Sequence, residues 1–376
     1  MVKGSLSQGA VFARGALSAG QRCCRRILRT SISHREGGCQ PMPNSAKSIR
    51  ACFAAALLLS FCATAALAQN PYIAVIEKVA GAVGFYTEDG KSLGQVKVGS
   101  FPHEAVLSAD GRLLYVGVNG VLWMTEDKLG ANTISVVDVH AMKKVADIDL
   151  GRFHRPHGIA LVPGTNRLLA TTERPFGLIL VDPVARKVIR DYDVRGKSPH
   201  MVIPMPGGEW AFVSDTDSDA VAAIQLHTGA VKLIPTAARP QGAVLSPAAD
   251  RLYVVNTDGN RISIIDTAKQ EVVGSIPTGK GPGRIALTPD GQTLVYNLQF
   301  EPAVGFADIP SGKQVAMVPL SGRPLSLTMT RDGRRVFAGV QDQDKLIFVS
   351  VPDRKIERVI ELPKDSGPDP AIPLRN

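Results

Sequence analysis

The chain has 376 residues, of which 36 are Gly and 26 are Pro, and 44% are hydrophobic, 5% aromatic and 20% charged. It is too apolar to be intrinsically disordered and too rich in Gly and Pro to be a helical bundle. The formal net charge of +9 and the five cysteines suggest nucleic-acid binding or redox chemistry, but the place of these residues in the chain argues against both.

The N-terminal part of the chain has the pattern of an export signal. Residues 51–68 form an apolar run that follows two basic residues and ends in Ala-Leu-Ala, which matches an n-region, an h-region and a small-residue cleavage site. We expect a signal peptide over residues 42–68 that is cleaved after Ala68, and a mis-assigned start over residues 1–41. Because the run is too short for a good spanning helix, we expect the mature chain to be periplasmic or secreted, without a membrane span. The alternative is an uncleaved anchor.

The basic excess and the cysteines all lie in this N-terminal part. Residues 1–68 hold nine Lys and Arg, one acidic residue and the five cysteines, which leaves 34 basic and 33 acidic residues for the mature chain. A protein that binds nucleic acid through its phosphates needs a basic patch or stripe, so the sequence argues against a nucleic-acid partner. Without cysteines, the mature chain has no thiol, disulfide or Cys-zinc chemistry.

Seven copies of a proline-anchored repeat organise the mature chain. In each copy a proline is followed by small or polar residues and then by alternating apolar positions, as in RPHGIALVPGT and RPQGAVLSPAA. The prolines are Pro102, Pro156, Pro199, Pro240, Pro282, Pro324 and Pro368, at intervals of 54, 43, 41, 42, 42 and 44 residues. Such a regular period indicates a repeat architecture.

Each repeat predicts four strands. An alternating segment follows the proline, and turn signals such as Asp110-Gly111 and Asp290-Gly291 separate it from three more segments of the same kind. Period-two alternation between clusters of Gly, Asn, Asp and Pro is typical of antiparallel strands. Four strands in a repeat of this length are typical of a propeller blade, so we predict an all-β protein.

The two ends of the repeat array predict that the ring closes. Residues 71–99 contain three alternating segments before the first proline, and residues 368–374 contain only one after the last proline. Together they make one four-stranded blade, and pairing the C-terminal strand with the N-terminal strands removes the exposed strand edges. We therefore predict a seven-bladed β-propeller over residues 69–376 and expect it to be a monomer.

The repeat resembles that of the YVTN-repeat, YncE-like β-propellers. Residues 253–256 read YVVN, nearly the tetrapeptide that names this family, and residues 239–279 are similar to one full family repeat. The tetrapeptide is replaced by ATTE at residues 170–173 and by VYNL at residues 295–298. The resemblance covers essentially the whole mature chain and implies the fold, but it assigns no reaction because the repeated motif consists of strand and turn residues.

Three successive repeats place a histidine directly after the anchor proline: His103, His157 and His200. The other repeats carry Gln241, Gly283, Leu325 and Asp369 at this position. In a propeller this strand begins beside the central channel, so we expect the three imidazoles on one face, here called the top face. Imidazoles bind divalent metals and transfer protons near neutral pH. The three histidines are therefore candidate ligand-binding residues and candidate metal ligands, and packing at the strand entrance is the alternative.

Polar turns after the second strands are expected on the same face. Glu173 and Asp215 follow second strands in the histidine-bearing repeats, where carboxylates complete a cation site or act as acid–base partners. Residues 256–258 occupy the equivalent turn of another repeat, and hydrogen bonding to their own backbone is the simpler interpretation. Asp residues that end third strands, such as Asp138, are interpreted as turn-formers.

A long loop is predicted in the first full repeat. The interval of 54 residues exceeds the others by about a dozen, and the extra length falls between the second and third strands and contains Trp123. An apolar tip on a top-face loop suggests a lid or a partner contact, and packing of Trp123 onto the neighbouring blade is the alternative. Arg155, Arg239 and Arg323 precede anchor prolines, where a guanidinium can face an anionic ligand or solvent.

The sequence favours a non-catalytic scaffold that binds a small molecule or a periplasmic protein on its top face. The ligand-binding residues that we predict are His103, His157, His200, Glu173, Asp215 and Trp123. Motifs of serine hydrolases, NTPases, zinc proteases and c-type cytochromes do not occur in the sequence.

The alternative is an enzyme similar to the propeller lactonases, cycloisomerases and lyases. In that interpretation His157 or His200 acts as the acid–base group, and Arg174 or Arg239 anchors an anionic substrate, with or without a divalent metal.

Overall fold

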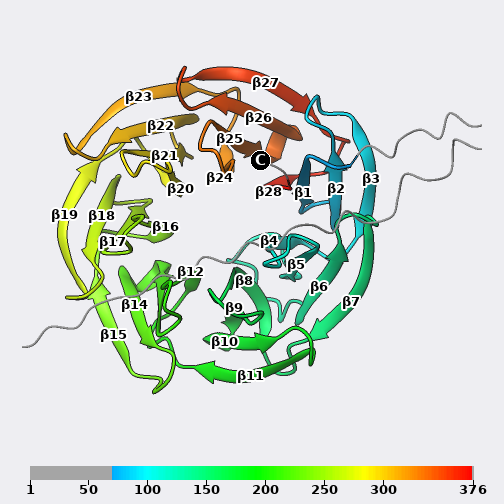
Figure 1. The fold of residues 1–376 in the computed structure, drawn as a ribbon, viewed down its shortest axis with the longest axis horizontal. Helices are drawn as coiled ribbons and strands as arrows, with labels where there is room; N and C mark the ends of the chain where they lie inside the picture. The colour runs from blue at the N-terminus through cyan, green and yellow to red at the C-terminus, as the bar shows by residue number, and fades with distance from the viewer. Residues whose placement is uncertain (1–69, 375–376) are drawn as a thin grey trace, which may run out of the picture. The chain divides into compact units, whose positions relative to one another are not determined.

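Seven four-stranded antiparallel sheets form a ring around a central channel (Figure 1). The computed structural model describes residues 70–374. These residues confirm the predicted all-β propeller of seven blades. The expected mis-start over residues 1–41 and the expected signal peptide over residues 42–68 lie outside the described residues.

Each blade has the same strand order from the channel outward. The innermost strands are β4 (Pro102–Leu107), β8 (His154–Leu161), β12 (Pro199–Pro204), β16 (Pro240–Leu245), β20 (Pro282–Leu287), β24 (Pro324–Met329) and β28 (Pro368–Pro373). The second strands are β5 (Leu113–Val118), β9 (Leu168–Arg174), β13 (Trp210–Asp215), β17 (Arg251–Asn256), β21 (Thr293–Leu298), β25 (Arg335–Val340) and β1 (Ile73–Glu77).

The outer half of each blade completes the sheet. The third strands are β6 (Thr133–Asp138), β10 (Phe176–Asp182), β14 (Ala220–Gln225), β18 (Arg261–Asp266), β22 (Ala303–Asp308), β26 (Lys345–Ser350) and β2 (Ala82–Tyr86). The outermost strands are β7 (Lys143–Asp149), β11 (Lys187–Tyr192), β15 (Val231–Pro235), β19 (Glu271–Pro277), β23 (Lys313–Pro319), β27 (Lys355–Glu361) and β3 (Ser92–Lys97). Two short 3-10 turns, η1 (Thr216–Ser218) and η2 (Gln341–Gln343), follow β13 and β25.

Burial along the strands follows their place in the blade. The second strand β1 and the third strand β2 are buried throughout, because neighbouring blades cover both faces of each sheet. The outermost strand β7 alternates between exposed and partly buried positions, because its outer face meets solvent. Alternation of apolar and polar residues, with one face of the strand exposed to solvent, is the pattern that predicts these strands from the sequence.

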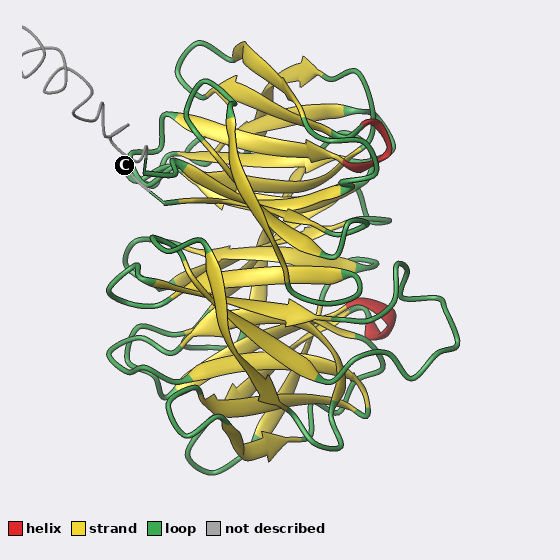
Figure 2. Ribbon diagram, turned by 90° about the vertical axis from the view of Figure 1, so that its right-hand side faces the viewer, coloured by secondary structure: helices red, strands yellow, loops and turns green. Residues whose placement is uncertain are grey.

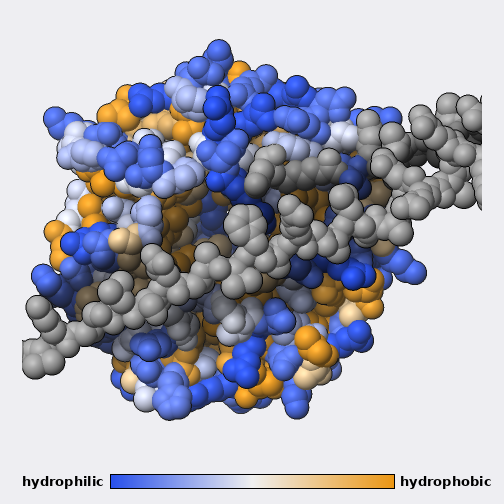
Figure 3. Space-filling view, viewed as in Figure 1, coloured by the Kyte–Doolittle hydropathy of each residue, from blue (hydrophilic) through white to orange (hydrophobic). Residues whose placement is uncertain are grey.

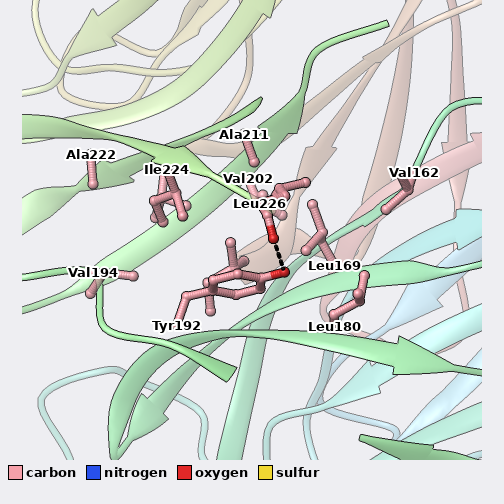
Figure 4. Close-up of a cluster of buried hydrophobic side chains, with 12 residues drawn as sticks. Val162, Leu169, Leu180, Tyr192, Val194, Val202, Ala211, Ala222, Ile224 and Leu226 are labelled. Carbon is pink, nitrogen blue, oxygen red and sulfur yellow. Dashed lines mark hydrogen bonds between the residues drawn. The ribbon is translucent and has the colours of Figure 1, made fainter. Parts of the chain in front are cut away.

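The hydrophobic core is divided among the interfaces between blades. Figure 4 shows one interface, where Leu169 and Tyr192 of one blade pack against Ile224 and Leu226 of the next. The Tyr192 hydroxyl donates a hydrogen bond of 3.0 Å to the Leu226 carbonyl, which satisfies the one polar group of this ring. Because each blade uses both faces in this way, no blade can bury its apolar surface alone.

The ring is closed by the two ends of the described chain. β28 pairs with β1, so that the C-terminal strand joins the three N-terminal strands in one sheet. The resulting blade packs against its neighbour through Ile73, Val75 and Phe337. This confirms the predicted closure, in which β28 covers the inner edge of β1.

The two faces of the ring differ in their loops. Connections between second and third strands open on the top face, which carries η1 and η2, and the long connection between β5 and β6 projects from it (Figure 2). Viewed along the ring axis, polar and apolar side chains are interspersed around the visible rim (Figure 3). Within residues 70–374, no helix has the length and apolarity needed to cross a bilayer.

Candidate functional site

A β-bulge follows the anchor proline in every blade and positions the site. In β8, Pro156 pairs with Thr172 and Ile159 with Ala170, so that β8 has one more residue than β9 between the two pairs. The same irregularity occurs in the other six innermost strands. A bulge re-aims the side chain of the extra residue. The residue after each proline is thereby turned toward the channel.

The side chains at this position line one pocket of about 120 Å³. The six that take part are His103, His157, His200, Gln241, Leu325 and Asp369. The seventh position is Gly283, where a Cβ atom would lie 2.1 Å from the Gln299 side chain, so the missing side chain leaves room for Gln299 to reach the pocket. We call this set of seven residues the channel ring.

Neighbouring innermost strands approach closely enough to stack the histidines. A Cβ atom on Gly158 would lie 2.3 Å from the His200 carbonyl oxygen, so glycine is required after His157. Thr171 on β9 donates a hydrogen bond of 2.7 Å to that same carbonyl. The imidazole centroids of His103 and His157 are 4.0 Å apart, and those of His157 and His200 are 4.2 Å apart.

Two of the three imidazoles are oriented by carboxylates. His157 Nδ1 donates to Glu173 Oε1 at 2.8 Å, and His103 Nδ1 lies 2.7 Å from Asp369 Oδ2. His103 Nε2 then accepts from the Lys78 ammonium at 3.3 Å. In contrast, His157 Nε2 and His200 Nδ1 are buried and have no hydrogen-bond partner among the described residues.

Burial keeps two of the histidines neutral. Burial, together with the neighbouring charges of His157 and Lys78, lowers the pKa of His103 to about 3 against the opposing effect of Asp369. Burial also lowers the pKa of His200 well below its ordinary value. Burial by itself would raise the pKa of Glu173, but the hydrogen bond with His157 and the charge of Arg155 outweigh it, so this pKa is lowered.

Arg155 links the site to the long top-face loop. Its side chain is 2% exposed and lies 2.6 Å from Glu173 Oε2. The same guanidinium donates to the carbonyl oxygens of Met124 at 2.8 Å and Glu126 at 3.0 Å. The loop that carries Trp123 is therefore held over the pocket through Glu173, the carboxylate that also orients His157.

The pocket lining has apolar and polar residues. The apolar residues, here called the apolar wall, are Val121, Leu122, Trp123 and Met124 of the long loop, and Leu325 on β24. Trp123 is 47% exposed, and the Lys78 ammonium lies 5.9 Å from its ring. The structure thus places Trp123 at the pocket mouth.

The polar wall continues across the ring from the histidines. Arg284 donates to Glu104 Oε1 from two nitrogens, at 2.7 and 3.2 Å. Arg323 donates to Gln299 Oε1 at 3.0 Å, and its guanidinium lies 5.4 Å from the Phe300 ring. Three buried ion pairs therefore surround the pocket, and Arg323 is an additional cation at its mouth.

A group of potential metal ligands is formed by His103, Glu104 and His157. One ligand atom from each lies within 4.8 Å of the others. His200 is not part of this group, although its ring stacks on His157. The side chain of Glu104 is already engaged by Arg284, and His103 Nε2 by Lys78.

Several residues singled out in the sequence lie away from the pocket lining. Asp215 is buried, and it accepts hydrogen bonds from the backbone amides of Lys197 and Ser198. Arg174 forms a surface ion pair with Asp127. Arg239 pairs on the surface with Asp217 and Asp258.

The turn residues behave as expected for structural positions. Asp138 accepts from the backbone amides of His140 and Ala141, and Asn256 donates to the backbone carbonyls of Val254 and Arg261. These contacts confirm the interpretation of both as turn-stabilising residues.

Sequence reasoning missed three charged residues of the site, namely Lys78, Glu104 and Arg284. Lys78 follows a second strand, at the position that carries Asn119 in the next blade. It contacts His103 of the next blade and Asp369 on β28 of its own, closing blade. Arg284 lies two residues after an anchor proline and meets Glu104 across the ring. Of the arginines predicted to face an anionic ligand or solvent, Arg155 is buried against Glu173 and Arg323 lines the pocket. The repeat position was the available signal for Lys78 and Arg284, but their partners depend on the closed ring.

Known proteins similar to this chain share its fold. No family model matches the chain. Two curated relatives, both named YncE, from Salmonella typhimurium strain LT2 and Salmonella typhi, are 24% identical over 206 residues and 27% identical over 207 residues. Each match covers 53% of this chain and 54% of the relative, so the chain spans about half the length of the curated relatives it matches.

Two solved structures extend the similarity to most of the ring. A functionally unknown protein from Desulfotomaculum acetoxidans matches with a TM-score of 0.68 and 15% identity, over 81% of this chain and 98% of that chain. The dihydro-heme d1 dehydrogenase NirN in complex with DHE matches with a TM-score of 0.59 and 16% identity, over 78% and 64% of the two chains. At these identities the likeness concerns the fold alone.

The fold and the site define a seven-bladed β-propeller with a polar pocket on its axis. Over about half of its length, the chain is similar in sequence to the two Salmonella proteins named YncE.

Proposed function

We propose that the protein is a non-catalytic binding propeller that holds a small molecule in its axial pocket. The observation that carries this proposal is the channel ring: one repeated bulge turns His103, His157, His200 and Asp369 toward a single cavity. Binding sites are typically concave, pre-formed and lined by a few convergent polar groups, and they often occur on loops held by a rigid scaffold.

The pocket is costly as a purely structural element. A buried polar group without a hydrogen-bond partner costs about 1–3 kcal/mol, and His157 Nε2 and His200 Nδ1 are two such groups. Buried ion pairs are often no more stabilising than apolar residues of similar size. An arrangement of buried charges and imidazoles that lines a cavity and gains little stability is better explained by a ligand.

The charges around the pocket favour an organic ligand over a divalent metal. Lys78, Arg155 and Arg284 match the three buried carboxylates Glu104, Glu173 and Asp369. A dication would leave two uncompensated positive charges in a buried site, which is unfavourable. It would also have to displace Lys78 from His103 and compete with Arg284 for Glu104.

The enzyme alternative receives less support from the geometry. Arg174 and Arg239, its anion anchors, pair with surface carboxylates outside the pocket lining. The His157–Glu173 pair is suitable for proton transfer, but His157 Nε2 is buried between two other imidazoles.

We further propose that the protein acts in the periplasm or outside the cell. The apolar run of residues 51–68 with its Ala-Leu-Ala end supports export. The intact mass of the protein isolated from the cell envelope tests this: a chain that begins at Gln69 is expected, and a chain that retains residues 42–68 would contradict it.

Native mass spectrometry of the same material tests for the ligand. We expect the native mass to exceed the denatured mass by a small molecule. Gln241→Trp, which fills the pocket, should abolish the excess, whereas Val272→Trp on the outermost strand of the same blade, where the residue is 40% exposed, should retain it. Equal native and denatured masses for the unmodified protein, or an excess that survives Gln241→Trp, would contradict the proposal.

A further inference from the structure

We infer that the ligand is a small monoanion with an apolar body, such as an aromatic or short aliphatic carboxylate. The inference rests on the proposed binding function and names the chemical class of its ligand. It follows from the charge balance, the two unlike walls and the size of the pocket.

The charge balance leaves one cation without a carboxylate. The Lys78–Asp369, Arg155–Glu173 and Arg284–Glu104 pairs have N···O distances of 3.3, 2.6 and 2.7 Å. Arg323 lines the same pocket, and among residues 70–374 it takes part in none of the ion pairs. Its described hydrogen bond is to the neutral Gln299. The pocket therefore has one more fixed positive charge than negative charge.

The histidines add hydrogen-bonding groups without changing the charge balance of the pocket. With low pKa values, His103 and His200 are uncharged at neutral pH. The buried Nδ1 of His200 has no partner among the described residues. A carboxylate that accepts from Arg323 makes a charge-assisted hydrogen bond, which is stronger than a neutral one.

The apolar residues of the lining require an apolar body. A fully polar ligand would leave Val121, Leu122, Trp123, Met124 and Leu325 in contact with its solvated groups. Trp123 at the mouth offers an aromatic face to a planar ligand. A ligand that is polar at one end and apolar at the other fits both walls.

The volume limits the size of the ligand. A cavity of about 120 Å³ holds roughly ten water molecules at 10–15 Å³ each. A ligand of roughly ten non-hydrogen atoms fills this space. Benzoate, with one carboxylate on one aromatic ring, is a probe of suitable size and charge, and benzamide is its neutral counterpart of the same shape.

The experiment compares benzoate with benzamide by isothermal titration calorimetry on the full chain. We expect benzoate to bind and benzamide to bind at least tenfold more weakly, because only the carboxylate makes a charge-assisted bond to Arg323. Arg323→Gln should weaken benzoate binding at least tenfold. Arg239→Gln, a top-face arginine outside the pocket lining, is the control and should bind benzoate like the unmodified protein.

Equal binding of benzoate and benzamide, or full benzoate binding by Arg323→Gln, would overturn the inference. Gln241→Trp separates this failure from that of the proposed function. If it abolishes binding of both probes equally, the pocket binds ligands but does not select an anion. If neither probe binds while a copurified molecule is lost in Gln241→Trp, the binding function stands and the ligand class is wrong.

Discussion

The two halves of the channel ring share one backbone but differ in chemistry. On one side β28, β4, β8 and β12 present Asp369, His103, His157 and His200, and on the other β16, β20 and β24 present Gln241, Gly283 and Leu325. The anchor proline and the bulge are the same in both halves. The backbone is therefore repeated in all blades, whereas the titratable side chains of the channel ring lie on one side only.

The difference between the two halves shows which side chains the fold requires at the channel-ring position and which it only permits. If an imidazole were needed to form the strand entrance, the Gln, Gly and Leu blades would not close with the same geometry. They do close, so the histidines are not required by the fold. Side chains that the scaffold permits but does not require are candidates for function.

The largest expected difference between the halves follows removal of Glu173. Glu173→Ala leaves Arg155 buried without its carboxylate and His157 without its acceptor, which should lower the free energy of unfolding by about 3–5 kcal/mol. Gln241→Ala removes only a long 3.4 Å contact with Gln299 and should cost less than about 1 kcal/mol. Urea unfolding of both variants measures the difference, and similar losses would show that the two halves are energetically alike.

The glycine that follows the channel-ring residue should be equally important for stability in both halves. A Cβ atom on Gly158 would lie 2.3 Å from the His200 carbonyl oxygen, and one on Gly242 would lie 2.8 Å from the Gly283 carbonyl oxygen. We expect Gly158→Ala and Gly242→Ala each to cost about 1–3 kcal/mol or more, because the clash is with backbone. Thermal unfolding provides the comparison. If Gly242→Ala were neutral, the spacing of the innermost strands would not be shared around the ring.

The titratable half should make stability depend on pH. An unfolded histidine takes up a proton near its ordinary pKa of about 6.5, but burial prevents His103 and His200 from doing so in the fold. Protons therefore favour the unfolded state below that pH. The stability that these neutral histidines allow is fully present above about pH 6.5. As the pH falls toward 3, the free energy of unfolding decreases by up to about 1.4 kcal/mol per pH unit for each histidine.

Variants of two histidines isolate this effect. Between pH 6 and 4.5, the free energy of unfolding of His200→Phe should fall less steeply than that of the unmodified protein. His227→Gln, at an exposed position, should not change the slope. Parallel slopes for His200→Phe and the unmodified protein would contradict the assignment of His200 as a buried neutral imidazole.

The sequence predicted those parts of the molecule that repeat. The prolines, the alternating strands and the Asp-Gly turns fix four strands per blade, and the split seventh blade follows from the strands left over at each end. His103, His157 and His200 were found together because one repeat position means one place in the ring.

What could not be predicted depends on contacts between distant repeats. Glu104 and Arg284 are 180 residues apart and meet only after closure of the ring. Asp215 was expected to bind ligand, but its carboxylate points back to the Lys197 and Ser198 amides of its own blade. Whether a carboxylate faces the pocket or the backbone depends on local side-chain geometry that the strand pattern does not encode.

The stability of His200→Phe at pH 7 tests the central claim most directly, namely that the histidine half-ring serves a ligand and not the fold. Phenylalanine keeps the ring in the stack but removes the buried Nδ1 that has no partner among the described residues. We predict that the free energy of unfolding, measured in urea without added ligand, rises by about 1 kcal/mol. A decrease of 2 kcal/mol or more would show that His200 is a packing residue and would contradict the account.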